Sequence, residues 1–185
     1  MSDETFLNTT KKVEDIMGNT HRQCSIEVEN KTSKYTLCNP RWYTYSGFCK
    51  TPFPPTLDPS KSGSALFIKT PGAACGSVGV FTYDLLNGST NQNDGKIAVM
   101  FSNPFDFNLY SNSYAVGVFD MAKKCDCGLY KEMYYDAERK FVRGKAADGS
   151  LTHESKLNTI TATMSDSYQP DIKVQVLKIP RDAFE

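Results

Sequence analysis

Short runs of strand-forming residues recur along most of this chain and are separated by clusters of turn-forming residues. Ser25–Asn30 alternates with period two, and we expect it to pair with Tyr35–Cys38 as a hairpin across a turn over 30–33. The spacing of the runs is typical of a sandwich. The sequence therefore predicts a mainly β fold, an antiparallel β-sandwich, with further strands over 42–48, 64–69, 77–86, 96–102, 114–119, 159–164 and 172–179.

Two other segments have helical periodicity, which predicts a sandwich flanked by two α-helices. Residues 2–18 begin with acidic, cap-forming residues and end at Gly18, and residues 126–139 place Tyr130 and Tyr134 on one face. The first helix carries a narrow apolar stripe, which in most proteins would be the face of a helix packed on the fold. The stripe and its flanks are Phe6, Leu7, Val13, Ile16 and Met17.

Length, charge and the N-terminus limit the classes of function. The 185 residues fit one domain. Lysine and arginine number 21 and are balanced by 21 acidic residues, so we expect no nucleic-acid partner. Met1 is followed by Ser-Asp-Glu, and no run approaches the roughly 18 apolar residues of a membrane span. We expect a soluble chain without a signal peptide, either cytoplasmic or released to act at a cell membrane.

Cysteines and histidines give no sign of a metal or catalytic site. Six cysteines do not form a disulfide framework in a chain of this length, and we interpret them as reduced thiols. Cys125 and Cys127 have the wrong spacing for a zinc site, and His21 and His153 lie far from them in sequence. We predict no metal and no cofactor. Gly-x-Ser-x-Gly, phosphate-loop and His-Glu-x-x-His motifs are absent, so an enzyme is the least favoured class.

The stretch from Phe101 to Tyr114 is rich in aromatic rings and contains no lysine or arginine. Predicted strands lie on either side of it, so its rings are expected at a loop tip, where aromatic exposure marks a contact with lipid headgroups, a sugar or a protein. Tyr130, Tyr134 and Tyr135 follow on the second predicted helix. Taken alone they would more often be core residues. Their density near the loop favours a site, because facing rings bind a quaternary ammonium and hydroxyls donate to its phosphate.

Two of these segments, in this order and spacing, resemble the actinoporins, the pore-forming cytolysins of sea anemones, and their actinoporin-like relatives in vertebrates. The segments are Phe101-Ser102-x-Pro104-x-Asp106-x-Asn108-x-Tyr110-Ser111-Asn112 and Leu129-Tyr130-Lys-Glu-Met-Tyr134-Tyr135. A third match runs from Ala74 to Tyr83, and Ser46-Gly47 lies where the family has a Ser-Gly pair. Together the matches cover about residues 24 to 180.

The resemblance implies a soluble monomer that docks on choline phospholipids, self-associates and inserts its N-terminal helix as a cation-permeable pore. Phosphatidylcholine is the expected lipid, and sphingomyelin is a second option. Glycans are a further possible class of partner. Residues 1–23 would be the inserting segment and 24–185 the sandwich domain. The implied phosphocholine pocket is lined by Ser46, Ala73, Ser102, Pro104, Tyr110, Tyr130, Tyr134 and Tyr135, and the implied membrane-contacting loop residues are Phe107, Leu109, Ser113 and Tyr114.

Several positions depart from the family pattern and keep a second hypothesis open. Leu109, Ser113 and Tyr114 stand where many sea-anemone members have tryptophans, and Arg143-Gly144-Lys145 replaces an Arg-Gly-Asp-like segment. Tryptophan is a preferred residue of the headgroup layer, so anchoring is expected to be weaker. The alternative is a non-lytic module of the same fold that binds a lipid headgroup or a glycan in the manner of a lectin.

Overall fold

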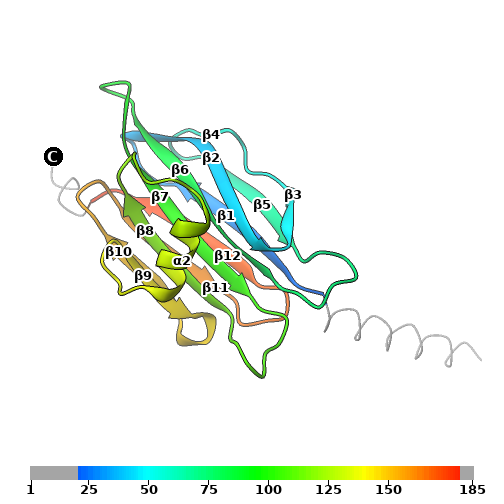
Figure 1. Ribbon diagram of the computed structural model, residues 1–185. Coiled ribbons are helices and arrows are strands. Elements are labelled where there is room, and N and C mark those ends of the chain that lie inside the picture. Colours follow the sequence, from blue (N-terminus) through cyan, green and yellow to red (C-terminus); the bar gives the residue numbers. More distant parts are fainter. Residues whose placement is uncertain (1–20, 180–185) are drawn as a thin grey trace, which may run out of the picture.

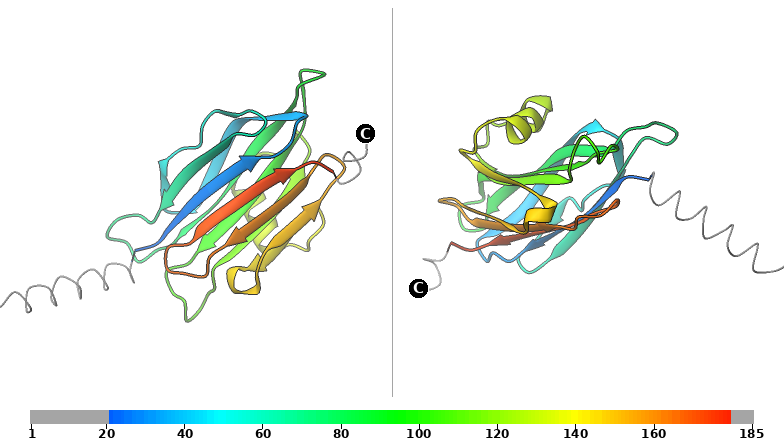
Figure 2. Two further views of the ribbon diagram at one scale, coloured as in Figure 1. Left: turned by 180° about the vertical axis from the view of Figure 1, so that it is seen from behind. Right: turned by 90° about the horizontal axis from the view of Figure 1, so that it is seen from below.

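The computed structural model describes residues 21–179, which form two six-stranded sheets packed face to face (Figure 1, Figure 2). The predicted helix over 2–18, with its apolar stripe, lies outside the described residues. The first sheet contains, in spatial order, β10 (Leu151–Glu154), β11 (Thr159–Met164), β12 (Asp171–Leu177), β1 (Gln23–Asn30), β5 (Ser62–Ile68) and β3 (Phe48–Thr51). The second contains β4 (Thr56–Leu57), β2 (Tyr35–Ser46), β6 (Ser77–Asn87), β7 (Gln92–Asn103), β8 (Ser113–Phe119) and β9 (Phe141–Lys145).

The prediction of a β-sandwich is confirmed, but two details of the strand pairing are wrong. Ser25–Asn30 does not pair with Tyr35–Cys38, because β1 lies in the first sheet and β2 pairs with β6 in the second. The buried Asn30 fixes this crossing, since its Nδ2 donates to the carbonyls of Tyr35 at 2.8 Å and Leu57 at 2.9 Å. The sandwich is also not wholly antiparallel, because β1 runs parallel to β12 from Ser25 opposite Asp171 onwards.

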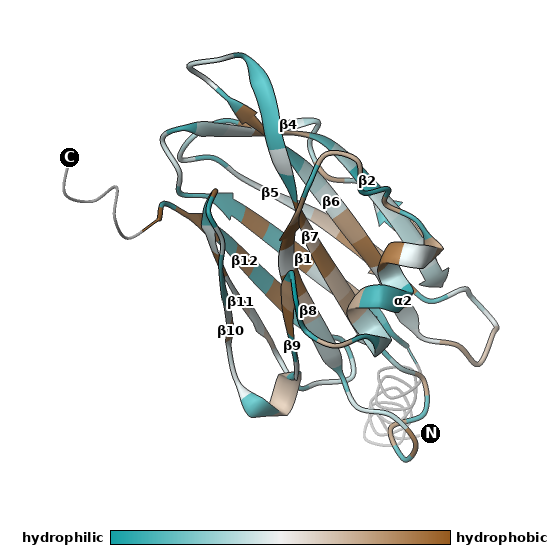
Figure 3. Ribbon diagram, turned by 60° about the vertical axis from the view of Figure 1, so that its left-hand side comes forward, coloured by the Kyte–Doolittle hydropathy of each residue, from teal (hydrophilic) through white to brown (hydrophobic). Residues whose placement is uncertain are grey.

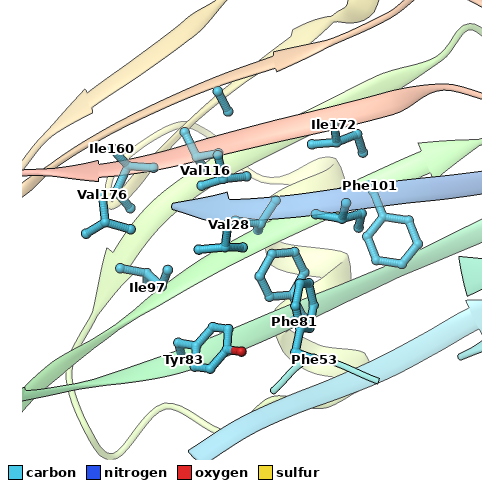
Figure 4. Packing of buried hydrophobic residues seen from close by; sticks show 14 of the residues in the cluster. Val28, Phe53, Phe81, Tyr83, Ile97, Phe101, Val116, Ile160, Ile172 and Val176 are labelled. Atoms are coloured by element: carbon cyan, nitrogen blue, oxygen red, sulfur yellow. The ribbon is translucent and has the colours of Figure 1, made fainter. Parts of the chain in front are cut away.

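Strands β6 and β7 are buried on both faces. Phe81 and Tyr83 point into the space between the sheets, where Figure 4 shows them with residues of both layers. Val78 and Val80, on the opposite face of β6, pack with Met133 of helix α2 (Cys127–Tyr135). Burial on both faces favours nearly continuous apolar runs, visible as brown segments on these strands in Figure 3. The helix is therefore part of the core.

Within residues 21–179, α2 is the only α-helix, and the short 3-10 turn η1 (Ala146–Asp148) follows β9. The predicted helix over 126–139 is present but ends at Tyr135. Arg143 donates from Nη1 to the carbonyls of Met133 at 3.0 Å and Asp136 at 2.9 Å, so its side chain satisfies backbone acceptors at the end of the helix. No helix in this range is long and apolar enough to cross a membrane.

Tyr114 is fully buried in β8, so the expectation that its ring contacts a membrane does not hold in this fold. It lies opposite Phe101 of β7 and faces the space between the sheets. Its hydroxyl donates to the carbonyl of Gly149 at 2.6 Å and lies 3.2 Å from that of Ala162. Strand alternation directs this side chain into the sandwich. The expectation rested only on the position of Tyr114 at the end of the aromatic stretch.

We therefore expect Tyr114→Phe to destabilise the sandwich by about 1–2 kcal/mol, because it leaves buried carbonyl groups without their hydroxyl donor. Urea unfolding measures the change. Tyr110→Phe is the matched control, since Tyr110 is 57% exposed and its hydroxyl is not in the core. Equal stability of the two variants would show that the Tyr114 hydroxyl contributes nothing.

Candidate functional site

Helix α2 brings three of the predicted tyrosines to one end of the second sheet. Asp126 caps the helix by accepting a hydrogen bond from the amide of Leu129 at 3.0 Å. Leu129 and Met133 are buried against the sheet, together with the body of Tyr130. Tyr134 is half-buried and Tyr135 is 67% exposed. The packing of the apolar face thus fixes the positions of the phenol rings beside it.

A row across three strands places two serine side chains on the face that α2 covers. Ser46 of β2 and Ser102 of β7 both lie opposite Val78 of β6. The two serine backbones are therefore two strand spacings apart, about 10 Å. A bulge between Thr44 and Ser46 adds Tyr45 as an extra residue, so that Tyr45 and Ser46 both line the same cavity.

Two glycines permit the close backbone approaches around this row. Gly47 has a φ of 79°, and a Cβ on it would lie 2.2 Å from the carbonyl oxygen of Ile68. A Cβ on Gly76 would lie 2.3 Å from the carbonyl oxygen of Asn103. Only glycine fits at these positions without moving the backbone, which explains the Ser46-Gly47 pair noted in the sequence.

The segment between β7 and β8, residues 104–112, is called the aromatic loop from here on. The Asp106 side chain accepts from the amide of Asn108 at 2.9 Å, and the Asp106 carbonyl accepts from the amide of Tyr110 at 3.0 Å. This local turn chemistry is typical of aspartate. It turns the chain back so that Tyr110 lies over the cavity that Asp106 also lines.

These elements enclose a cavity of about 490 Å³, which we call the tyrosine cavity. This volume lies within the usual range of small-molecule sites, about 300–1,000 Å³. The structure brings together seven of the eight residues that the resemblance implies. The lining residues are Tyr45, Ser46, Ala74, Cys75, Gly76, Val78, Ser102, Pro104, Phe105, Asp106, Tyr110, Tyr130, Tyr134 and Tyr135.

Four of the tyrosine rings are in direct contact along one wall of the cavity. The rings of Tyr45 and Tyr130 are stacked, with centroids 4.9 Å apart and planes 23° apart. Tyr130 and Tyr134 are 5.7 Å apart, and Tyr134 meets Tyr135 edge-on at 4.7 Å. Burial raises the pKa of the Tyr130 and Tyr134 phenols above their ordinary value. The phenols therefore stay neutral at physiological pH, and their ring faces can attract a cation through the ring quadrupole.

The only charge among the described residues that line the tyrosine cavity is negative. Among the described residues that line it, Asp106 is the only one with a charged side chain. The Ser46 and Ser102 hydroxyls can donate to a phosphate or accept from a sugar hydroxyl. A carboxylate, aromatic faces and neutral hydroxyl donors suit a zwitterionic ligand, whose cation meets the rings and the carboxylate and whose anion meets only neutral donors. They do not suit a ligand that is only anionic.

Arg22 ties the aromatic loop to the start of β1. The side chain is 4% exposed, and it donates from Nε to the carbonyl of Pro104 at 2.9 Å and from Nη2 to that of Phe105 at 2.8 Å. Its guanidinium also lies 5.3 Å from the Phe105 ring centroid and 4.8 Å from that of Phe107. Arg22 thus positions two residues that line the cavity, Pro104 and Phe105.

Of the other predicted site residues, some are exposed as expected and others lie away from the cavity or are partly buried. Ala73 does not line the tyrosine cavity, and its neighbours Ala74 and Cys75 do. Leu109 is 72% exposed at the loop tip, as expected for a contact residue. Phe107 is half-buried against Tyr168, and Ser113 is half-buried in β8 opposite Ser102.

Sequence reasoning missed Tyr45, Cys75, Phe105 and Asp106 as site residues. The place of Tyr45 in the site could not be predicted, because a β-bulge between Thr44 and Ser46 redirects its side chain and strand alternation does not reveal a bulge. Asp106 had a signal, since it belongs to the quoted motif and is acidic in a stretch without lysine or arginine. Across residues 21–179, no group of three or more His, Cys, Asp or Glu side chains could hold a metal ion.

Replacing Arg22 by lysine keeps the charge but removes the fork that reaches two carbonyls. We expect Arg22→Lys to loosen the aromatic loop, so that the amides of Leu109 and Tyr110 exchange with solvent about tenfold faster. Hydrogen exchange detected by mass spectrometry measures this. Arg41→Lys is the control, because Arg41 lines a different cleft near residues 121–126. Unchanged exchange in Arg22→Lys would contradict the clamp.

Comparison with known proteins gives matches over most of the chain. The family model described as sea anemone cytotoxic protein matches residues 2–174. DELTA-actitoxin-Aas1a of Anthopleura asiatica is 35% identical over 136 residues, which are 71% of this chain and 59% of that protein. Deep-sea actinoporin Cjtox I of Cribrinopsis japonica is 32% identical over 166 residues, covering 89% of this chain and 70% of that protein.

A solved structure agrees in fold with this chain. The crystal structure of the lipid binding protein Nakanori has a TM-score of 0.67 at 10% identity, covering 92% of this chain and 79% of that one.

The chain matches only 55% of the length of DELTA-thalatoxin-Avl1b of Actineria villosa, at 36% identity over 71% of this chain. The extent of the family match and the level of identity show that this chain belongs to the sea anemone cytotoxic protein family, the actinoporins.

Proposed function

We propose that this protein docks on membranes by binding a choline phospholipid headgroup in the tyrosine cavity, then self-associates and forms a pore. The observation that carries the docking step is that a wall of four contacting tyrosine rings and one carboxylate line the same cavity, with no lysine or arginine among the described lining residues. A quaternary ammonium is attracted to ring faces and to a carboxylate. Phosphatidylcholine and sphingomyelin both present this group.

The geometry supports one orientation of the headgroup. Ser46 and Ser102 lie on the sheet that forms the floor, beside Val78, and both can donate to phosphate oxygens. The ammonium pole then lies among Tyr110, Tyr134 and Tyr135, near Asp106. Lipids whose headgroup is only anionic would meet the Asp106 carboxylate without a compensating cation, so we expect them to bind poorly.

Pore formation is the step that family membership supports. The curated relatives include an actinoporin, and several others carry toxin names. The segment expected to insert is 1–23, but Arg22 holds the aromatic loop and Gln23 pairs with Ile68 in the sheet. In this proposal the residues ahead of Arg22 therefore insert, and copies of the sandwich associate on the membrane. The relevant side chains are Phe6, Leu7, Val13, Ile16 and Met17. A path lined by Glu4, Glu14 and Asp15 beside Lys11 and Lys12 would prefer cations only mildly.

A non-lytic headgroup or glycan binder is the second candidate, and the composition of the rim favours it. The tip residue of the aromatic loop is Leu109, and Ser113 is half-buried, so neither supplies an interfacial tryptophan. Exposed rings beside serine hydroxyls and a carboxylate also suit a sugar. This candidate keeps the tyrosine cavity and omits insertion.

One set of samples tests both candidates. Soluble phosphocholine is titrated by calorimetry, and phosphatidylcholine vesicles with and without sphingomyelin are tested for co-sedimentation and dye release. Binding with release supports the pore, and binding without release supports the non-lytic module. A protein that binds neither phosphocholine nor any of these vesicles would refute the docking proposal, and screening of glycans would follow.

The role of the carboxylate is tested by Asp106→Asn. Asparagine can still accept the hydrogen bond from the Asn108 amide, so the turn is kept while the charge is lost. We expect phosphocholine affinity to fall about three- to tenfold. Asp148→Asn, an exposed position on η1, is the control. Unaltered affinity in Asp106→Asn would remove the carboxylate from the binding model.

Cys75 offers a covalent probe of the same cavity. Cys75 is half-buried and lines the cavity, so an N-ethylmaleimide adduct should occupy part of the cavity and weaken phosphocholine binding. Burial raises the pKa of the Cys125 thiol to about 11, and burial also raises the pKa values of Cys38 and Cys49, which slows their reaction. Cys75→Ser treated with the reagent should still bind. If wild-type protein shown by mass spectrometry to be modified at Cys75 bound normally, the ligand would lie elsewhere.

A further inference from the structure

A second cleft adjoins the tyrosine cavity on the other side of the aromatic loop. It has a volume of about 420 Å³ and is lined by Arg22, Phe105, Asp106, Phe107, Asn108 and Tyr168. Phe105 and Asp106 line both spaces. The two spaces therefore adjoin along the aromatic loop.

Tyr168 belongs to the loop over 165–170, which joins β11 to β12. In Figure 1 and Figure 2 this loop and the aromatic loop lie at the same end of the sandwich. The Tyr168 ring is 48% exposed, a large fraction for an aromatic residue that is held by neighbours. Leu109 and Tyr110 of the aromatic loop are 72% and 57% exposed. Large side chains of two separate loops thus remain exposed at this end.

The Tyr168 ring is fixed from two sides. It meets the Phe107 ring edge-on at 5.3 Å, and the Arg22 guanidinium lies 5.0 Å from its centroid. Asn112 joins the two loops, because its Nδ2 donates to the carbonyl of Ser167 at 2.7 Å and lies 3.3 Å from Asp166 Oδ1. A ring that is already ordered loses little conformational entropy when it enters an interface.

The guanidinium beside Tyr168 does not make this cleft a site for anions. Three backbone carbonyls accept from Arg22, those of His21, Pro104 and Phe105. Its guanidinium carbon also lies over the rings of Phe105, Phe107 and Tyr168. Burial lowers the pKa of Arg22, and the nearby Tyr168 opposes that shift. The surface therefore presents aromatic rings rather than a free cation.

We propose that Tyr168 is a second interfacial anchor, which enters the headgroup layer of a choline phospholipid bilayer beside the aromatic loop. The inference rests on the proposed docking function. The tyrosine cavity and the cleft beside Tyr168 adjoin at Phe105 and Asp106. A membrane lipid bound in the cavity would therefore bring Tyr168 to the same membrane surface. An amphipathic phenol suits that layer. The anchor comes from a loop that sequence analysis did not associate with membranes, and it adds aromatic contact where Leu109 and Ser113 supply little.

A tryptophan reporter tests the depth of this loop. The chain has one tryptophan, Trp42, in β2. In the double variant Trp42→Phe/Tyr168→Trp, fluorescence should shift to shorter wavelength on phosphatidylcholine vesicles, and lipids brominated near the glycerol should quench it. Wild-type Trp42 should show neither change. An emission that stays unshifted and unquenched on bound protein would overturn the proposal. So would a blue-shifted emission before vesicles are added, because another part of the protein would then cover the ring.

Partition to vesicles tests the contribution to binding. Tyr168→Ala should weaken partition about three- to tenfold, while Tyr168→Phe should keep most of it. Met121→Ala is the matched control, because Met121 is 37% exposed in the loop after β8, at the opposite end of the second sheet. Soluble phosphocholine should bind all these variants equally. If Tyr168→Ala lost phosphocholine and vesicle binding to the same extent, Tyr168 would act by shaping the cavity, and the anchor would be refuted.

Soluble phosphocholine also separates this inference from the function beneath it. Wild-type protein that binds neither phosphocholine nor vesicles refutes both proposals. Protein that binds both, with no loss of partition in Tyr168→Ala, refutes only the anchor. A loss of partition at unchanged phosphocholine affinity supports the anchor.

Discussion

The structure depends on the burial of β6 and β7 on both faces. A sheet that is apolar on one side needs a single partner layer, but Val78 and Val80 on the far side of β6 require a second cover. Helix α2 supplies that cover, and its position is set by Leu129 and Met133 rather than by the tyrosines. The rings of the candidate site are therefore held by the same packing that stabilises the domain. Their arrangement does not require a ligand.

Several independent elements meet in the tyrosine cavity, and each contributes one kind of chemistry. Strand register supplies two hydroxyls beside Val78, and the bulge in β2 adds the ring of Tyr45. The turn at Asp106 brings a carboxylate and Tyr110 from the aromatic loop. Because these groups come from different parts of the sequence, the site is preorganised only in the folded domain. This is consistent with recognition of a small zwitterionic group by a rigid surface.

Much of the fold and most of the site could be predicted from the sequence, and the misses have physical causes. Alternation in Ser25–Asn30 identifies the buried face of a strand, but it cannot identify the neighbouring strand, so the crossing at Asn30 and the parallel pair were missed. Motif spacing identified seven lining residues. It failed for Tyr114, whose direction is set by strand alternation, and for Tyr45, which a bulge redirects. Local sequence carries no signal of the contact between Arg22 and the aromatic loop, which spans 82 positions.

The parallel pairing of β1 with β12 has a mechanical consequence. β1 lies in the middle of its sheet, with six residue pairs to β12 and seven to β5. A pull on the chain ahead of residue 21, directed along β1, would load both ladders in shear, so that many hydrogen bonds resist at once. Peeling an edge strand would instead break them one after another. A force applied to the chain ahead of β1 would therefore be borne by both neighbouring strands without unravelling the sandwich.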